Sequence, residues 1–120
     1  MAVTLDDART FGLGLPRTTE GVVHGRLKLR VGQIVYVDFS RDETVMGFAY
    51  PKEERDALIA SDPDKFQLPR PSDLRYNWVA VRLAALDLDE LRELVYDAWR
   101  MVVPKRVAAE LEERHGGVPW

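Results

Sequence analysis

Cysteine is absent from the 120-residue chain, so disulfide bonds and thiolate chemistry are excluded. Histidine is scarce: His115 lies in a terminal stretch that we expect to fray, and His24 alone makes a poor metal site. The chain also lacks an apolar run of about 18 residues and a charged leader followed by an apolar segment. We therefore expect no membrane span, signal peptide, metal or cofactor, and a cytoplasmic location.

A large excess of one charge is missing as well. The formal net charge is -3, which argues against a protein that coats nucleic acid through its overall charge. Basic residues outnumber acidic ones up to Arg30, whereas acidic residues cluster from Asp87 to Asp97. With 46% hydrophobic and 31% charged residues and no internal repeats, the composition predicts one globular domain over residues 1–120.

The most clearly specified stretch runs from Tyr76 to Lys105. It begins with apolar residues that alternate with other residues at a period of two, the inward set being Val79, Val81 and Leu83. This pattern predicts a strand with one apolar face.

A helix is predicted to follow this strand. Asp87 is expected to be its N-cap, with Glu90 completing a capping box. Apolar residues then recur at helical spacing up to Val102, so this helix should pack on the sheet. Pro104 ends it and opens a last helix, which is predicted to finish at Gly116.

The region before this stretch combines helices with short strands. Thr4 and Asp7 predict a first helix through a weaker capping box, and Pro51 opens a second one. Between them, alternation and turn residues predict four antiparallel strands within residues 19–50. We expect the loop of residues 62–72 to be ordered by packing of Phe66 and Leu68, the alternative being a mobile or functional loop.

This order of elements contains no repeated βαβ unit. It predicts an α+β fold, a two-layer sandwich with helices packed on one face of an antiparallel sheet. The other face of the sheet is then left open to solvent or to a partner.

Several motifs occur in an order that one protein family shows. They are Leu15-Pro16, the strand ending at Arg30-Val31-Gly32, the segment YPKEERDAL, the DPDKF loop, and the pairs Trp99-Arg100 and Pro104-Lys105. On these motifs, nearly the whole chain resembles the MmcQ/YjbR family of small bacterial proteins. The resemblance implies a curved antiparallel sheet, here called YjbR-like, and a DNA-binding role. The chain departs from the family pattern at Asn77, where glycine is usual, and at Phe48, where lysine is frequent.

One group of residues suggests a nucleic-acid surface. Arg26, Lys28 and Arg30 alternate with leucines and a valine along one strand, so their side chains share its outward face. The hypothesis joins them across the sheet with Arg82 and adds Tyr36 and Trp78 as stacking platforms; arginines suit phosphate oxygens and aromatic rings suit unstacked bases. Two alternatives remain: a solvated sheet face whose charges are paired by nearby acids, and a buried Trp78.

A second candidate is an anion site at the junction of the last two helices. Arg100 and Lys105 are placed to hold an anion at the start of the last helix. The alternative is that Arg100 complements the dipole at a helix C-terminus and Trp99 is a core residue.

No catalytic motif is present. His24 is expected to be a turn residue, and the serines lack the sequence context of a nucleophile. We therefore expect that the protein is not an enzyme, and the family resemblance implies a DNA-binding or regulatory role. The alternatives are a protein-interaction or self-association module, and a binder of a small acidic ligand through Arg82, Arg100 and Lys105.

Overall fold

The computed structural model describes residues 2–120, and its helices and strands follow the predicted order. The α-helices are α1 (Leu5–Leu13), α2 (Lys52–Ser61), α3 (Leu88–Arg100) and α4 (Lys105–His115). The strands are β1 (Thr18–Val23), β2 (Arg26–Val31), β3 (Ile34–Phe39), β4 (Val45–Ala49), β5 (Phe66–Gln67) and β6 (Trp78–Arg82). Two short 3-10 helices cover Pro71–Asp73 and Leu83–Ala85.

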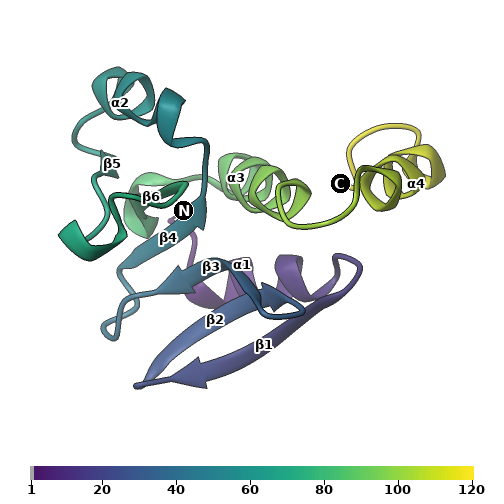
Figure 1. Ribbon diagram of the computed structural model, residues 1–120, viewed down its shortest axis with the longest axis horizontal. Coiled ribbons are helices and arrows are strands. Elements are labelled where there is room, and N and C mark those ends of the chain that lie inside the picture. The colour runs from purple at the N-terminus through teal and green to yellow at the C-terminus, as the bar shows by residue number, and fades with distance from the viewer. Residues whose placement is uncertain (1) are drawn as a thin grey trace.

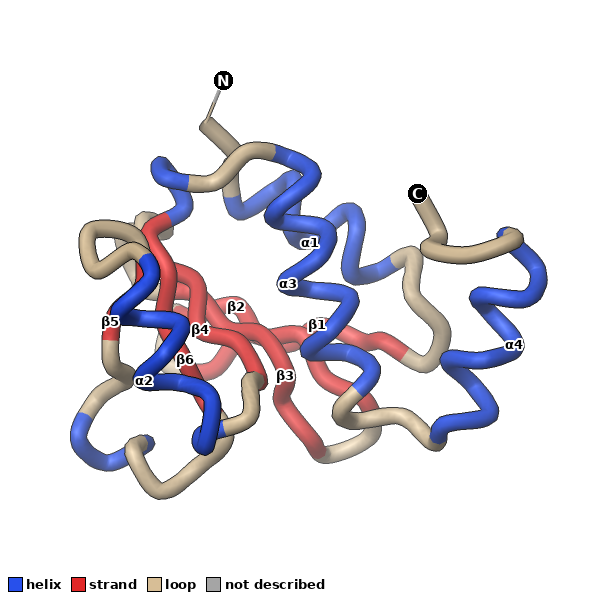
Figure 2. Tube along the Cα trace, turned by 90° about the horizontal axis from the view of Figure 1, so that it is seen from above, coloured by secondary structure: helices blue, strands red, loops and turns tan. Residues whose placement is uncertain are grey.

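The six strands form one curved antiparallel sheet in the order β1-β2-β3-β4-β6-β5 (Figure 1). The strand that opens the best-specified stretch, β6, lies between β4 and the two-residue β5. Helices α1 and α3 lie over the middle of the sheet, whereas α4 lies beyond the end of α3 (Figures 1 and 2). The predicted α+β sandwich is confirmed.

The face of the sheet under α1 and α3 forms the core. Leu29, Val37, Val79 and Val81 are fully buried there, and so is Trp99 of α3. The opposite face, here called the outer face, has a different composition. A row in register across the sheet places Lys28, Asp38, Gly47, Ala80 and Gln67 side by side on it.

A β-bulge corrects the predicted position of Tyr36. Leu29 pairs with Val37 and Arg30 pairs with Val35, so Tyr36 is an extra residue without a partner on β2. Its side chain therefore turns to the core side, where it is fully buried and its hydroxyl lies 2.8 Å from the Thr18 hydroxyl. The prediction that Tyr36 belongs to the outer surface is wrong, because simple alternation does not survive a bulge.

The helix boundaries follow the predicted caps with two exceptions. The first is the end of α3, which was predicted at Pro104 but lies at Arg100, so that Met101 is outside the helix and 42% exposed. The Thr4–Asp7 capping box forms, Pro104 precedes α4, and Gly116 caps the end of α4 with a positive φ of 68°. The Asp87 side chain accepts a hydrogen bond of 2.8 Å from the Glu90 amide. The other half of that predicted box is wrong, because the Glu90 carboxylate pairs with Lys65.

The loop before β6 also differs from expectation. Phe66 packs into the core as predicted, but Leu68 is 56% exposed. Phe66 and Gln67 form β5, which pairs with β6, and Leu68 is the first residue beyond that pairing. Among the helices of residues 2–120, none has both the length and the apolar character needed to cross a bilayer.

Candidate functional site

Small residues leave space at the centre of the outer face. Gly47 lies between Asp38 on β3 and Ala80 on β6, and a Cβ atom at Gly47 would lie 2.6 Å from Trp78 Nε1 and would collide with the Asp38 carboxylate. The Asp38 carboxylate and the Trp78 indole therefore meet above Gly47. Only a glycine allows both side chains to lie on the sheet at this position.

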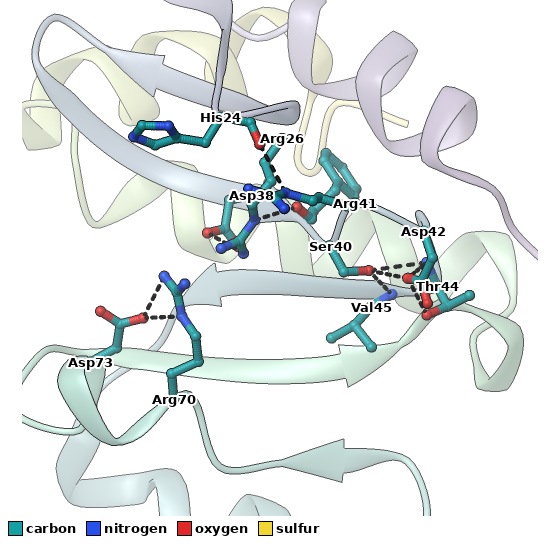
Figure 3. Close-up of polar contacts among 11 residues, drawn as sticks. His24, Arg26, Asp38, Ser40, Arg41, Asp42, Thr44, Val45, Arg70 and Asp73 are labelled. Carbon is teal, nitrogen blue, oxygen red and sulfur yellow. Dashed lines mark hydrogen bonds and ion pairs between the residues drawn. The ribbon is translucent and has the colours of Figure 1, made fainter.

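The segment of residues 68–77, here called the wall segment, stands beside this floor. Sheet residues and the wall segment together line two hollows of about 610 and 410 Å³. Both hollows are lined by Asp38, Arg70, Asp73 and Trp78, so we treat them as one groove. In Figure 3 the Arg70–Asp73 pair of the wall faces the Arg26–Asp38 pair of the sheet across the groove.

Helix α2 holds the wall segment in place. Arg55 Nη1 donates hydrogen bonds to the carbonyls of Tyr76 (3.2 Å) and Trp78 (3.1 Å), and Nη2 donates to the carbonyl of Leu74 (2.9 Å). The Lys52 amide, at the first turn of α2, donates to the Asn77 side chain at 3.0 Å. Asn77, at which the chain departs from the family pattern, thus caps α2 and links it to the groove.

Asp38 is a buried charged residue at the groove floor, with 7% of its surface exposed. Its Oδ2 accepts a hydrogen bond of 3.3 Å from Arg26 Nη2, while Arg26 Nε donates to the Phe39 carbonyl at 3.0 Å. Burial raises the pKa of Asp38, and the positive charges of Arg26, Lys28 and Arg70 oppose that rise.

Lys28 and Arg30 are the cations of β2 that remain available. Within residues 2–120 neither has an acidic partner within salt-bridge distance or a side-chain hydrogen bond. Lys28 lines the smaller hollow, and the Arg30 guanidinium lies against Gly21 of the edge strand β1. Arg26, by contrast, already donates hydrogen bonds to Asp38 and Phe39 of β3.

The remaining predicted residues of this surface have different positions. Trp78 is half-buried and lines both hollows. Arg82 is on the same face, opposite Val45, but its Nε donates to the Asp64 carbonyl at 2.7 Å and it does not line the groove. The structure thus brings together Arg26, Lys28 and Trp78, with Arg30 adjoining them, and separates Arg82 and Tyr36 from this group.

The predicted anion site contains two carboxylates as well. Arg100 and Lys105 do line a common hollow of about 590 Å³, together with Asp97 and Glu112. Arg100 lies 3.6 Å from Glu112, which also accepts a hydrogen bond of 2.6 Å from the Tyr96 hydroxyl. Arg82 does not line this hollow. Arg100 is thus paired with Glu112, which leaves Lys105 as the one cation of this hollow without a salt bridge among residues 2–120.

Sequence reasoning missed Gly47, Arg70 and Asp73 as groove residues. One signal was present: Gly47 and Ala49 on β4 and Ala80 on β6 occupy alternate positions, which indicates a sheet face without bulky side chains. The wall residues had no such signal. In the part of the chain that the structure describes, no three histidine or carboxylate side chains are grouped closely enough to hold a metal ion.

Fold and groove define a class, small α+β proteins with helices on one face of an antiparallel sheet and a groove on the other. The family model described as YjbR matches residues 13–101. The chain belongs to the YjbR family, which confirms the resemblance inferred from its motifs.

A solved structure supports the fold. The chain is similar to the crystal structure of Deinococcus radiodurans protein DR2400, which has a DUF419 domain, with a TM-score of 0.73 and 20% sequence identity. The match covers 97% of this chain and 90% of that one. At this identity the similarity establishes the architecture. No curated protein gives a significant match.

Proposed function

We propose that this protein binds single-stranded nucleic acid along the groove of the outer face. The observation that carries the proposal is the combination, in one groove, of an aromatic ring packed over Gly47 of the sheet with cations beside it that form no salt bridge among residues 2–120. The proposal assigns binding and no catalytic step, and it specifies the DNA-binding role that the family resemblance implies.

The aromatic part of the groove suits unstacked bases. Trp78 lies on the floor, and Tyr76, which is 51% exposed, lines the same smaller hollow. Stacking of one base on an aromatic side chain contributes about 1–3 kcal/mol and tolerates any sequence. In our proposal these two rings form the platform for one or two bases.

The cationic part of the groove suits the phosphate backbone of a nucleic acid. Lys28 and Arg30 form no salt bridge among the described residues, although Lys28 lies opposite Asp38 in the sheet. The Arg70 side chain is 62% exposed although it pairs with Asp73. These three side chains lie on or beside the groove and are our candidates for phosphate contacts. A local surface of this kind is compatible with a net charge of -3 for the whole chain.

A single strand is favoured over a duplex. Bases in a duplex are stacked and paired, so they reach a recessed ring only after unstacking, which costs a few kcal/mol. Trp78 is recessed between the sheet and the wall segment, as its place in both hollows shows. A single strand presents its bases to this ring without that cost.

A protein-interaction surface is the second candidate, and a specific observation favours it. Ile34, Tyr76 and Met101 are 54%, 51% and 42% exposed and line the smaller hollow together. Exposed apolar side chains that are contiguous commonly mark protein interfaces. Binding to such a partner would depend weakly on salt and would not require Lys28 or Arg30.

The test is a pair of charge-matched variants. The double variant Lys28→Gln/Arg30→Gln removes the free cations, whereas Arg106→Gln/Arg114→Gln removes two exposed cations of α4 and changes the net charge equally. Fluorescence anisotropy with labelled single strands and duplexes at low salt gives the affinities. We expect tighter binding of single strands, and a loss of at least about tenfold for the first variant alone. Equal affinities of the two variants would contradict the proposal.

A further inference from the structure

Asp38 is a chemical feature that phosphate and stacking contacts leave unused. Its carboxylate lies at the groove floor beside the Trp78 indole, where both occupy the space above Gly47. Only Oδ2 accepts a hydrogen bond, from Arg26; Oδ1 has no hydrogen-bond partner within residues 2–120. A carboxylate only accepts hydrogen bonds when it is ionised, so a ligand at this position should offer donors.

The nucleobases differ sharply in what they offer to a carboxylate. Guanine presents two adjacent donors, N1–H and the N2 amino group, which match the two oxygens of a carboxylate. Adenine and cytosine present one amino group beside a ring nitrogen acceptor, and thymine presents one N–H between two carbonyls. An acceptor placed next to a carboxylate is repelled, so only guanine meets Asp38 with two donors and no facing acceptor.

The cations around Asp38 can supply the donor that guanine also needs. The O6 acceptor of guanine lies next to N1–H, so the base also needs a donor on that side. Lys28 and Arg70 both line the smaller hollow with Asp38, and their charges act on this carboxylate. Asp73 of the wall segment pairs with Arg70 and keeps the guanidinium over the groove.

We propose that the groove selects guanine within a single strand: the base stacks on Trp78 and donates N1–H and its amino group to Asp38. This inference rests on the proposed function, because it assigns the base preference of the same groove. It adds an acidic residue to a surface otherwise described by its cations and aromatic rings. It also gives Gly47 a role, since glycine at that position lets the carboxylate and the ring lie together.

The experiment uses thymidine oligonucleotides with a single central base, which avoids structures formed by guanine runs. Central guanine, inosine, adenine and cytosine are compared by anisotropy with the whole protein. We expect guanine to bind about tenfold more tightly than adenine or cytosine, the discrimination typical of a bidentate base contact. Inosine keeps N1–H and lacks the amino group, so its affinity should be intermediate. Equal affinities for all four would overturn the inference.

A variant of Asp38 tests whether this residue is responsible for the guanine preference. Asp38→Asn should bind the four oligonucleotides with similar affinity, whereas Asp89→Asn, which removes an equal charge at an exposed position of α3, should keep the preference. Retention of the guanine preference in Asp38→Asn would overturn the assignment. If Asp38→Asn fails to fold, the comparison of guanine with inosine on the unmodified protein still decides whether the groove selects guanine. Absence of binding to every oligonucleotide would overturn the proposed function itself, which separates the two failures.

Discussion

At the scale of single residues, Gly47 and Asp38 determine the shape and chemistry of the groove. Gly47 is buried in β4, where a glycine ordinarily weakens a strand. Its benefit is the close approach of Trp78 and Asp38 from the two neighbouring strands. Glycine at this position weakens the strand but lets an aromatic ring lie against a carboxylate. We expect such an arrangement at a binding site.

Gly47→Ala tests this role directly. The added methyl group would displace the Trp78 ring and the Asp38 carboxylate, so we expect a stability loss of about 1–3 kcal/mol, as for other overpacked sites. The affinity for single strands should also fall, and by more than the reduced fraction of folded protein explains. Denaturant unfolding and anisotropy measure the two effects. Gly14→Ala is the control: Gly14 has a helical φ of -77°, and its Cβ would lie 3.3 Å from the Phe11 carbonyl.

Asp38 should also impose a pH dependence on stability. Because burial raises its pKa in the folded state, Asp38 keeps its proton to a higher pH in the folded protein than in the unfolded chain, where it titrates near pH 4. Stability is therefore lost as the pH rises through the folded-state pKa. Measured against Asp38→Asn, the unfolding free energy of the unmodified protein should decline on raising the pH from 4 to 7. A difference that is independent of pH would show that Asp38 has an ordinary pKa.

At the scale of elements, α2 and α3 have separate tasks. Helix α3 is anchored in the core by its buried stripe, and it begins at the Asp87 cap. Helix α2 has no buried residue of its own, yet its Arg55 and Lys52 hold the backbone of the wall segment. We infer that α3 contributes mainly to stability and α2 mainly to the position of the groove wall.

For α3, we predict a measurable loss of stability when the N-cap at Asp87 is removed. Asp87→Ala should lower the unfolding free energy by about 1 kcal/mol, because the Glu90 amide loses its acceptor. Asp89→Ala, at an exposed position of the same first turn, should cost much less. Equal costs of the two substitutions would mean that the charge near the helix start matters and the cap does not.

For α2, Arg55→Ala removes three hydrogen bonds to carbonyls of the wall segment and of β6. We expect a loss of about 1–3 kcal/mol, in the range for bonds to charged groups. Hydrogen exchange should accelerate at residues 74–78 while β2 and β3 keep their protection. Glu54→Ala, an exposed position on the same helix, serves as the control. Unchanged exchange in the wall segment of Arg55→Ala would contradict this role of α2.

At the scale of the whole molecule, the sequence predicted the fold better than the site. Alternation at Val79 and Val81, the cap at Asp87 and the proline at Pro104 are local signals, and together they were sufficient for the α+β sandwich. Tyr36 was misplaced because a bulge depends on the pairing of two strands, which alternation along one strand cannot reveal.

The groove was harder to predict because it is a tertiary feature. Its floor comes from β2, β3, β4 and β6, and its wall comes from residues 68–77, so no local pattern contains it. Arg70 and Asp73 lie in a proline-rich loop without periodicity, and Phe66 and Gln67 form a strand too short to recognise. The outward positions of Arg26, Lys28 and Arg30 were predictable, since they needed only the period of one strand.

The central claim is that cations of the groove bind the phosphates of a single strand. The most direct measurement is the dependence of single-strand affinity on salt, compared between the unmodified protein and Lys28→Gln/Arg30→Gln. With phosphate contacts from Lys28, Arg30 and Arg70, a plot of log affinity against log salt should have a slope of about -2, falling to about -0.7 in the variant. No binding at low salt, or the same slope for both proteins, would contradict the account.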